Sequence, residues 1–494
     1  MVRRALLAAL TLVVISSMSP VAQSRRFITE KDLLKFTWVA DPQISPDGSQ
    51  VAFVKVTANE KGDGYDTSLY VVPVKDGEIR RLTSGTRDTT PRWSPDGGRI
   101  AFVRTPPAAA GANGKPPVSQ IYLLDMSGGE GRVVTDAARG ANGPIWSPDG
   151  KTIAYSASTG KDAAKVNDRD SDVRVMTKAV YRENGNPGWV DNDHHSHIFT
   201  IRPPENPADK PVATQLTDGE FDEGGVTWAP DGKSIYFVST RVAEPYYDES
   251  GSELYAVPAS GGAIAKIASI EGSIGNLSPS PDGRRIAFVG SLRGKPIRSY
   301  SQPDLWITDA TAGSTPKNLT AAYDFDISGG IGGDQAAPRG QNRKPIVWAP
   351  DGASLTVVSA EKGSANLKRV TIANGKVDAI TDAPQDVGAF SATPNASVIA
   401  AITSTQTNIG DIAILDGPGS EGARRPSVLR TITHVNQELF KDIAQSEPEE
   451  IWYTSFDGKR IQGWILKPPD FDPSKKYPLI LEIHGGPHGS SSTT

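Results

Sequence analysis

The chain has 494 residues and a formal net charge of −5 at pH 7. This length allows two domains or one large repeat architecture, and the acidic balance excludes a general attraction to nucleic acid or anionic membranes. The absence of cysteine excludes disulfides, thiolate metal ligands and a cysteine nucleophile. The 49 glycines and 38 prolines favour many short elements joined by tight turns.

The first 24 residues have the layout of a secretory signal peptide. Arg3 and Arg4 precede an apolar run from Ala5 to Ile15, and small residues lead to Ser24. The run is too short to span a bilayer comfortably, although a retained N-terminal anchor is the alternative. We therefore expect a mature protein that begins near Arg25, is periplasmic or secreted, and has no stable membrane association.

Residues 25–40 are predicted to form a short helix and a lead-in to the next domain. The helix is expected within Arg26 to Phe36, with Thr29 as its N-cap and Asp32 three residues further on, as in a capping box.

A four-residue signature then recurs through most of the chain. It reads SPDG at 45–48, 94–97, 147–150 and 280–283, APDG at 229–232 and 349–352, and TPNA at 393–396. Each copy is followed by a short run of strand-forming residues. Four copies are preceded by tryptophan, at Trp93, Trp146, Trp228 and Trp348.

The signature predicts a β-hairpin, because proline fixes φ, aspartate caps the turn and glycine adopts a positive φ. Successive copies start 49, 53, 82, 51, 69 and 44 residues apart. A spacing near 50 fits one four-stranded blade, and the longer intervals fit blades with insertions. A single copy would be only a common turn, but seven copies predict a seven-bladed β-propeller over residues 41–436, in which the tryptophans pack between blades.

The 82-residue interval holds a charged and histidine-rich insertion. His194, His195 and His197 lie beside Asp191 and Asp193, which raises the hypothesis of a metal site. In a strand, however, His195 and His197 share one face while His194 points away. We therefore favour a solvated loop leading into a strand, and we expect neither a metal nor a cofactor.

Two arginines near this insertion are candidates for substrate binding. Arg182 and Arg241 are placed where a propeller loop can hold a guanidinium over a cavity, to pair with a carboxylate or carbonyl of a ligand. The alternative is that both are ordinary surface residues.

The pattern changes after Asn436. Residues 449–471 read as two strands joined by a turn at Asp457 and Gly458. A buried strand is then predicted from Leu479 to Ile483, followed by the glycine loop of residues 484–487. Because an α/β-hydrolase sheet begins in this way, residues 437–494 are predicted to be the start of an incomplete hydrolase domain, following the otherwise all-β propeller.

SPDG blades followed by a strand ending in HGGPHG resemble the prolyl oligopeptidase family of serine peptidases, within it the secreted bacterial members akin to acylaminoacyl peptidases and dipeptidyl peptidases. The resemblance implies a propeller that filters short peptides into a hydrolase cavity. It further implies a serine in a GxSxG elbow, followed by an aspartate and a histidine. Gly486 would offer its N–H to the oxyanion and Gly485 would allow close approach. Oligomers are compatible with a full-length member.

The sequence departs from this family pattern at its central residue. No serine in the 494 residues has glycine at both the second position before it and the second position after it. The nucleophile, aspartate and histidine are therefore expected beyond residue 494, and the chain alone is expected to be inactive. The alternative is a secreted propeller that binds peptides or proteins without catalysis. Residues 451–489 favour the peptidase hypothesis, because a binding propeller has no use for a hydrolase strand and loop.

Overall fold

The computed structural model describes residues 25–75, 77–107, 117–160, 176–182, 188–204, 206, 209, 211–244, 246–247, 251–296, 298, 300–333, 335–417 and 426–485. The predicted signal peptide lies outside these residues. No helix in the described ranges is long and apolar enough to cross a membrane.

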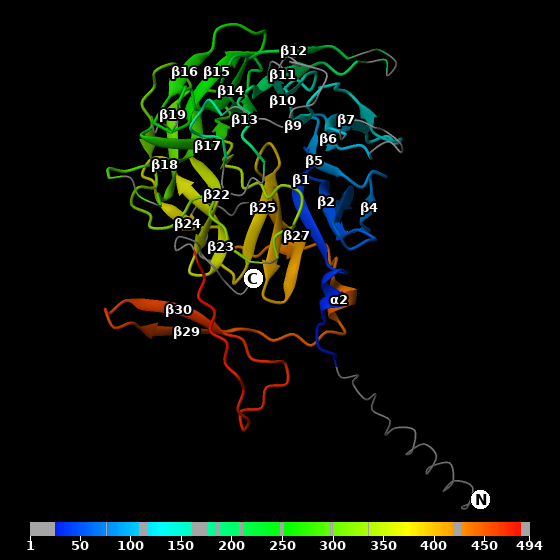
Figure 1. The fold of residues 1–494 in the computed structure, drawn as a ribbon, viewed down its shortest axis with the longest axis vertical. Helices are drawn as coiled ribbons and strands as arrows, with labels where there is room; N and C mark the ends of the chain where they lie inside the picture. The colour runs from blue at the N-terminus through cyan, green and yellow to red at the C-terminus, as the bar shows by residue number, and fades with distance from the viewer. Residues whose placement is uncertain are drawn as a thin grey trace, which may run out of the picture.

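Small antiparallel sheets follow one another along the chain and are arranged in a ring (Figure 1). The first sheet contains β1 (Thr37–Ile44), β2 (Gln50–Ala58), β3 (Tyr65–Pro73) and β4 (Arg80–Arg81). The second contains β5 (Asp88–Trp93), β6 (Arg99–Arg104), β7 (Gln120–Asp125) and β8 (Arg132–Val133). The third contains β9 (Ala141–Trp146), β10 (Ile153–Gly160), β11 (His194–Ile201) and β12 (Ala213–Gln215).

Two more four-stranded sheets and one of eight strands complete the ring. The fourth sheet contains β13 (Glu223–Trp228), β14 (Ser234–Ser239), β15 (Glu253–Pro258) and β16 (Ala265–Ala268), and the fifth contains β17 (Gly272–Pro279), β18 (Arg285–Leu292), β19 (Pro303–Asp309) and β20 (Lys317–Asn318). The eight-stranded sheet contains β21 (Val347–Trp348), β22 (Ser354–Glu361), β23 (Ser364–Thr371), β24 (Val377–Ala379), β25 (Asp386–Ala392), β26 (Val398–Thr405), β27 (Asn408–Asp416) and β28 (Arg430–Thr431).

The signature forms the predicted turn between the first two strands of each four-stranded sheet, and between β21 and β22 and between β25 and β26 of the eight-stranded sheet. In the β5–β6 hairpin, the Ser94 hydroxyl donates to the Asp96 carboxylate and accepts the backbone N–H of Arg99, while Gly97 has φ of 71°. The same Ser–Asp hydrogen bond recurs at Ser45, Ser147 and Ser280. The turn chemistry read from the sequence is thus confirmed at these copies.

The aspartate carboxylates of these turns make the folding stability of the protein depend on pH in the acid range. Hydrogen bonds from the serine hydroxyl, and then from a backbone N–H, hold the pKa values of Asp47, Asp96, Asp149 and Asp282 below the usual aspartate range. Because the folded pKa is the lower one, this stabilisation is present above the unfolded pKa of about 4 and is lost as pH falls through the folded value.

A variant with asparagine at all four positions is therefore expected to lose less stability than the wild type between about pH 4 and pH 2. Urea unfolding midpoints measured over this range test the prediction. Parallel pH profiles for the two proteins would contradict it.

The signature tryptophans connect neighbouring sheets, as predicted. Each indole N–H donates to a backbone carbonyl in the first strand of the preceding sheet: Trp93 to Gln43, Trp146 to Arg92, Trp228 to Ile145 and Trp348 to Ser278, at 2.9–3.1 Å. The Arg99 guanidinium also lies over the Trp146 ring, 5.0 Å from its centre. The tryptophans therefore align adjacent sheets and leave no indole N–H for a ligand at these positions.

Replacing Trp146 with phenylalanine is expected to cost about 1–3 kcal/mol of unfolding free energy, because it leaves the Arg92 carbonyl without its partner in a buried position. Chemical denaturation measures this loss. The matched change at the exposed Trp452 is expected to have a smaller effect, so equal losses at the two sites would contradict the assigned role.

Side-chain packing joins the beginning of the ring to its end. Val39, Phe53, Ala389, Ile402 and Ile412 belong to one buried cluster that spans β1, β2 and β25–β27. The Asn436 side chain also donates to the Thr37 carbonyl at 2.7 Å and accepts the Thr37 N–H at 2.9 Å. Every sheet of the described ring is built from strands that are consecutive in the sequence, so no strand from one end of the chain completes a sheet at the other end. Side-chain packing and the Asn436 amide close the ring instead.

The predicted N-terminal helix is shorter than expected. Helix α2 (Glu30–Leu33) has the predicted N-cap at Thr29, and its Asp32 carboxylate accepts the Thr29 N–H and pairs with Arg26 at 2.6 Å. Arg26 itself bridges to Ile443, just after helix α3 (Gln437–Phe440), so it cannot belong to the helix.

The C-terminal prediction is confirmed for one hairpin and wrong for the next strand. Strands β29 (Glu449–Thr454) and β30 (Arg460–Ile465) pair around Gly458, which has φ of 83°. Residues 479–483 form no strand, and Leu479, Ile480, Leu481 and Ile483 are 77–91% exposed. A parallel-type buried strand needs neighbours on both edges, and none of the described strands pairs with this segment.

Candidate functional site

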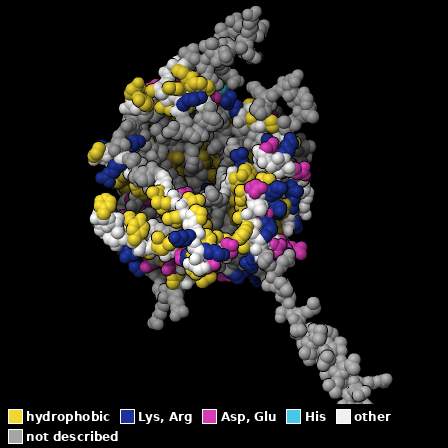
Figure 2. Space-filling view, turned by 60° about the horizontal axis from the view of Figure 1, so that its bottom comes forward, with side chains coloured by type: hydrophobic (Ala, Val, Ile, Leu, Met, Phe, Trp, Pro, Cys, Tyr) yellow, Lys and Arg dark blue, Asp and Glu magenta, His cyan; other side chains and the backbone are white. Residues whose placement is uncertain are grey.

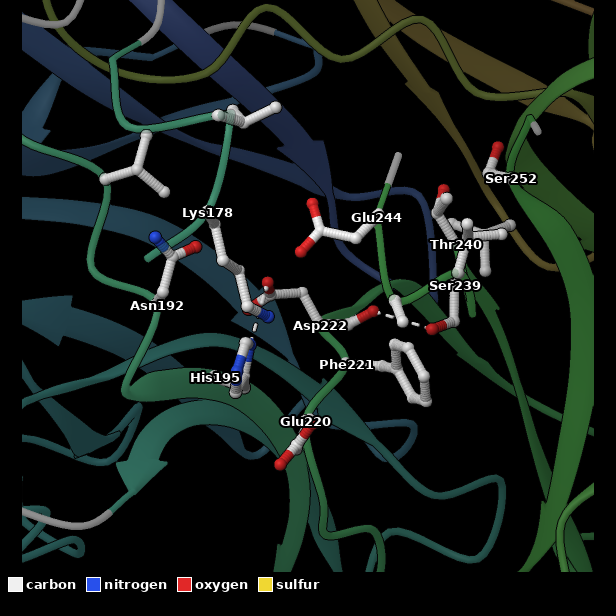
Figure 3. Close-up of a pocket in the computed structure, with 15 residues that line it drawn as sticks. Lys178, Asn192, His195, Glu220, Phe221, Asp222, Ser239, Thr240, Glu244 and Ser252 are labelled. Atoms are coloured by element: carbon white, nitrogen blue, oxygen red, sulfur yellow. Dashed lines mark hydrogen bonds and ion pairs between the residues drawn. The ribbon is translucent and has the colours of Figure 1, made fainter. Parts of the chain in front are cut away.

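A pocket of about 470 Å³ lies beside the third and fourth sheets (Figure 3). Its wall comes from the segment preceding β13, the end of β14 and the start of β11, together with part of the insertion. The polar lining residues include Lys178, Asn192, His195, Glu220, Asp222 and Glu244, and the apolar ones include Val180, Val190, Phe221 and Val238. The pocket therefore combines an apolar wall with several ionisable groups, as ligand pockets commonly do.

Carboxylates outnumber cations around this pocket. Glu220, Asp222 and Glu244 line it, against the ammonium of Lys178 and the imidazole of His195. Asp222 is held in place, because its Oδ1 accepts the backbone N–H of Ser196 at 2.7 Å and its Oδ2 lies 3.3 Å from His195 Nδ1. By charge, the pocket favours a ligand with a positive group.

Arg241 is bound to a buried carboxylate behind this pocket. Its Nη2 lies 2.6 Å from Oε1 of Glu223, whose Oε2 is 2.7 Å from His197 Nδ1 and accepts the Thr217 hydroxyl at 3.0 Å. The Glu223 side chain is fully buried. The pocket residues Thr240 and Val242 flank Arg241, so this network fixes the pocket wall.

The second sheet contains a similar ion pair. Asp88, the first residue of β5, accepts from the Arg104 guanidinium at 2.6 Å, and Asp88 is also fully buried. Glu223 and Asp88 both stand six residues before a signature, at Ala229 and Ser94. This recurrence indicates that Glu223 and Arg241 hold two strand ends together. The shared position of the two acids is visible in the sequence, although the four-residue signature does not include it.

Arg182 lies over an aromatic ring in the insertion. Its guanidinium is 4.5 Å from the centre of the Trp189 ring, which in turn stacks on Tyr181. Val180 and Val190, which flank this stack, line the pocket. The structure thus places Arg182 and Arg241 close in sequence to pocket residues, while a role of either in binding substrate stays a prediction.

The three histidines of the insertion do not converge. His194 pairs with Asp191, His195 with Asp222, and His197 with Glu223. Among the described residues, no group of three or more His, Cys, Asp or Glu side chains is placed to hold a metal ion.

The predicted oxyanion loop is described only in part. Gly485 is exposed, and apart from the glycine and its two chain neighbours no described atom lies within 4 Å of the position that a Cβ would take there. The His484 Nδ1 lies 3.0 Å from the Gly485 carbonyl. Gly486 lies outside the described residues, so its role as an N–H donor stays a prediction.

Comparisons with known proteins agree with the architecture. Residues 23–205 match the family model of the TolB beta propeller domain. The chain is 28% identical to the "uncharacterized peptidase YuxL" of Bacillus subtilis, over 94% of this chain and 67% of the relative. It is 25% identical to dipeptidyl-peptidase 5 of Porphyromonas gingivalis, over 97% of this chain and 66% of the relative.

The solved structure of the acylaminoacyl peptidase of Pyrococcus horikoshii is also similar. It matches 95% of this chain with a TM-score of 0.67 and 20% sequence identity, and the match covers 63% of that structure. The chain therefore spans about two thirds of the length of these relatives.

A ring of consecutive antiparallel sheets, linked by repeated turns, defines a β-propeller protein (Figures 1 and 2). Figure 2 shows one face of the ring hollowed in the middle, with hydrophobic side chains around the hollow. The resemblance to peptidases of the prolyl oligopeptidase family, drawn from the signature and the HGGP segment, is confirmed by the relatives, which are named as peptidases.

Proposed function

We propose that the chain is the propeller-bearing part of a serine-type peptidase that releases short units from peptides, as aminoacyl, acylaminoacyl or dipeptidyl products. One observation carries the proposal. The similarity to named peptidases extends over 94–97% of the chain, and thus beyond the ring into the hairpin that follows it. A propeller used only for binding has no need of that segment.

The catalytic residues are proposed to lie outside the 494 residues. No serine here occupies a GxSxG elbow, so the nucleophile, aspartate and histidine would come from the part of the relatives that this chain does not match. Gly485 and Gly486 would then approach the oxyanion. The exposed Leu479 and Ile480 would be covered by the remainder of a hydrolase sheet.

In this proposal the propeller limits access to the active site. We infer a seven-bladed ring, because a single residue pair, Ala365 with Asp386, joins β23 to β25 and divides the eight-stranded sheet into two blades. The ring would admit short peptides and exclude folded proteins. The carboxylates of the pocket suit a peptide with a positive group. The layout of residues 1–24 supports a periplasmic or secreted enzyme.

The alternative function is a secreted propeller that binds peptide or protein partners without catalysis. The relatives named above are peptidases, so the comparisons do not favour it.

The 494-residue protein is expected to show no turnover of aminoacyl, acylaminoacyl or dipeptidyl chromogenic substrates, because a triad enzyme without its nucleophile keeps only weak residual catalysis. Purified protein assayed with and without a serine-directed inhibitor tests this. Robust turnover that the inhibitor abolishes would contradict the proposed location of the triad.

A further inference from the structure

A second, smaller cavity lies where the first and last strands of the ring meet. Its volume is about 230 Å³. Trp38 comes from β1, Asp386 from β25 and Ser404 from β26, while Gln335 and Lys344 come from the segment between β20 and β21. The cavity therefore joins distant parts of the chain, and it does not share a residue with the pocket beside the third and fourth sheets.

Three buried polar atoms on residues that line this cavity have no hydrogen-bond partner in the described structure. They are the indole N–H of Trp38, the side-chain oxygen Oε1 of Gln335 and the carboxylate oxygen Oδ1 of Asp386. Only 9% of the Trp38 surface is exposed. Because buried polar groups are nearly always paired, three unpaired groups around one cavity need partners that the protein itself does not supply.

Protein contacts hold these groups in position. Gln335 Nε2 donates to the Thr405 carbonyl at 2.9 Å, which fixes the orientation of the amide and leaves Oε1 as its free acceptor. The Trp38 ring packs edge-on against Phe36 and Tyr65. The Lys344 ammonium donates to the Gly329 carbonyl at 3.0 Å and retains further donor capacity. The site is thus organised without a ligand, which limits the entropy lost on binding.

The polar side chains around this cavity include hydrogen-bond acceptors for an ammonium and donors for a carboxylate, which are the two charged groups of a zwitterion. Asp386 Oδ1 and Gln335 Oε1 are acceptors suited to an ammonium, while the Trp38 indole and the Lys344 ammonium are donors suited to a carboxylate. Burial lowers the pKa of Lys344 and raises that of Asp386, as expected for charges that the protein itself does not fully compensate. A single water, with its share of about 30 Å³ of liquid volume, does not fill such a space.

We propose that this cavity binds a small free α-amino acid, with its ammonium on Asp386 and Gln335 and its carboxylate on Lys344 and Trp38. A ligand held in this way would connect β1 to β25 and to the segment before β21. Since those elements meet where the ring closes, binding would stabilise the closed ring. The inference rests on the cavity and does not require the proposed peptidase function.

Isothermal titration of the purified chain with glycine, L-alanine and L-serine, together with thermal unfolding, tests the proposal. Saturable binding and a higher unfolding midpoint are expected for at least one of these amino acids. The corresponding amino acid amides and N-acetyl amino acids each lack one charge and are expected to bind at least about tenfold more weakly, which corresponds to about 1.4 kcal/mol.

Two variants locate the binding site. Asp386→Asn keeps the shape of the side chain and is expected to weaken binding at least about tenfold. Asp378→Asn, at an exposed ion pair outside both pockets, is expected to leave binding unchanged. Failure of all three amino acids to bind the wild type would overturn the proposal. Equal binding of the blocked analogues would do so as well, and that readout does not depend on the folding of any variant.

Discussion

The Arg241→Met variant is expected to lose about 3–5 kcal/mol of unfolding free energy, because it leaves the carboxylate of Glu223 buried without its cation. Glu223 is fully buried and its partner guanidinium lies 2.6 Å away. The remaining hydrogen bonds from His197 and Thr217 satisfy only the other carboxylate oxygen, Oε2. Methionine keeps the aliphatic contact with the surrounding aromatic rings, so the change tests mainly the charge.

A double-mutant cycle identifies the cause of this loss. Glu223→Gln combined with Arg241→Met is expected to be more stable than the sum of the single losses predicts, because neither buried charge then lacks a partner. Lys376→Met removes a comparable but exposed ion pair, with Asp378, and is expected to cost less than about 1 kcal/mol. An Arg241→Met protein as stable as the Lys376→Met control would instead support the ligand-binding role predicted for Arg241.

The Asp41→Asn variant is expected to be destabilised by about 3–5 kcal/mol through unbalanced cations inside the ring. Asp41 is fully buried and pairs with Arg92 at 2.8 Å. Arg92 also donates to Gln341, which lies just before Asn342 and Arg343 in the chain. The positive charge of Arg92 is the main cause that lowers the pKa of Arg343, although the Arg343 side chain itself is exposed to solvent. Without Asp41, the two guanidinium groups would lose the anion that balances them.

Asparagine is the appropriate replacement because Asp41 has φ of 48°, a conformation that asparagine tolerates and alanine does not. The loss therefore reports the charge rather than backbone strain. Denaturant unfolding measures it, and Asp378→Asn at an exposed pair is the matched control. Equal midpoints for the two variants would show that Asp41 does not balance the arginines.

The repeated parts of the fold could be predicted because their chemistry is local. Each signature places the serine, the aspartate and the glycine of one turn side by side in the chain, so the hairpin follows from the sequence alone. The signature tryptophan has the same relation to the preceding sheet at each of its positions, so its packing role could be read from repetition.

The second cavity and the buried ion pairs could not be predicted because their residues meet only in the folded ring. Asp41, Arg92 and Gln341 come from three distant parts of the chain, and so do Trp38, Gln335 and Asp386. No turn or spacing signal connects such positions. Glu223 is the exception, because its position before the signature matches that of Asp88.

The strand predicted at Leu479–Ile483 failed for a different reason. Its apolar, β-favouring residues are a valid signal of a buried strand, but a strand needs a partner to satisfy its backbone groups. The described structure offers none at this position, and the segment remains exposed. The residue types of the segment therefore correctly indicated a preference for a buried strand, but they carried no information on whether neighbouring strands would be present.

The reading frame downstream of codon 494 tests the central claim most directly. The proposed peptidase predicts that sequencing finds a GxSxG elbow, followed in order by an aspartate and a histidine, within on the order of 200 further codons. A polypeptide made from that longer frame should be labelled by a serine-directed fluorophosphonate. A downstream sequence with no such elbow, in any frame over several hundred codons, would contradict the peptidase proposal and favour a propeller that only binds its partners.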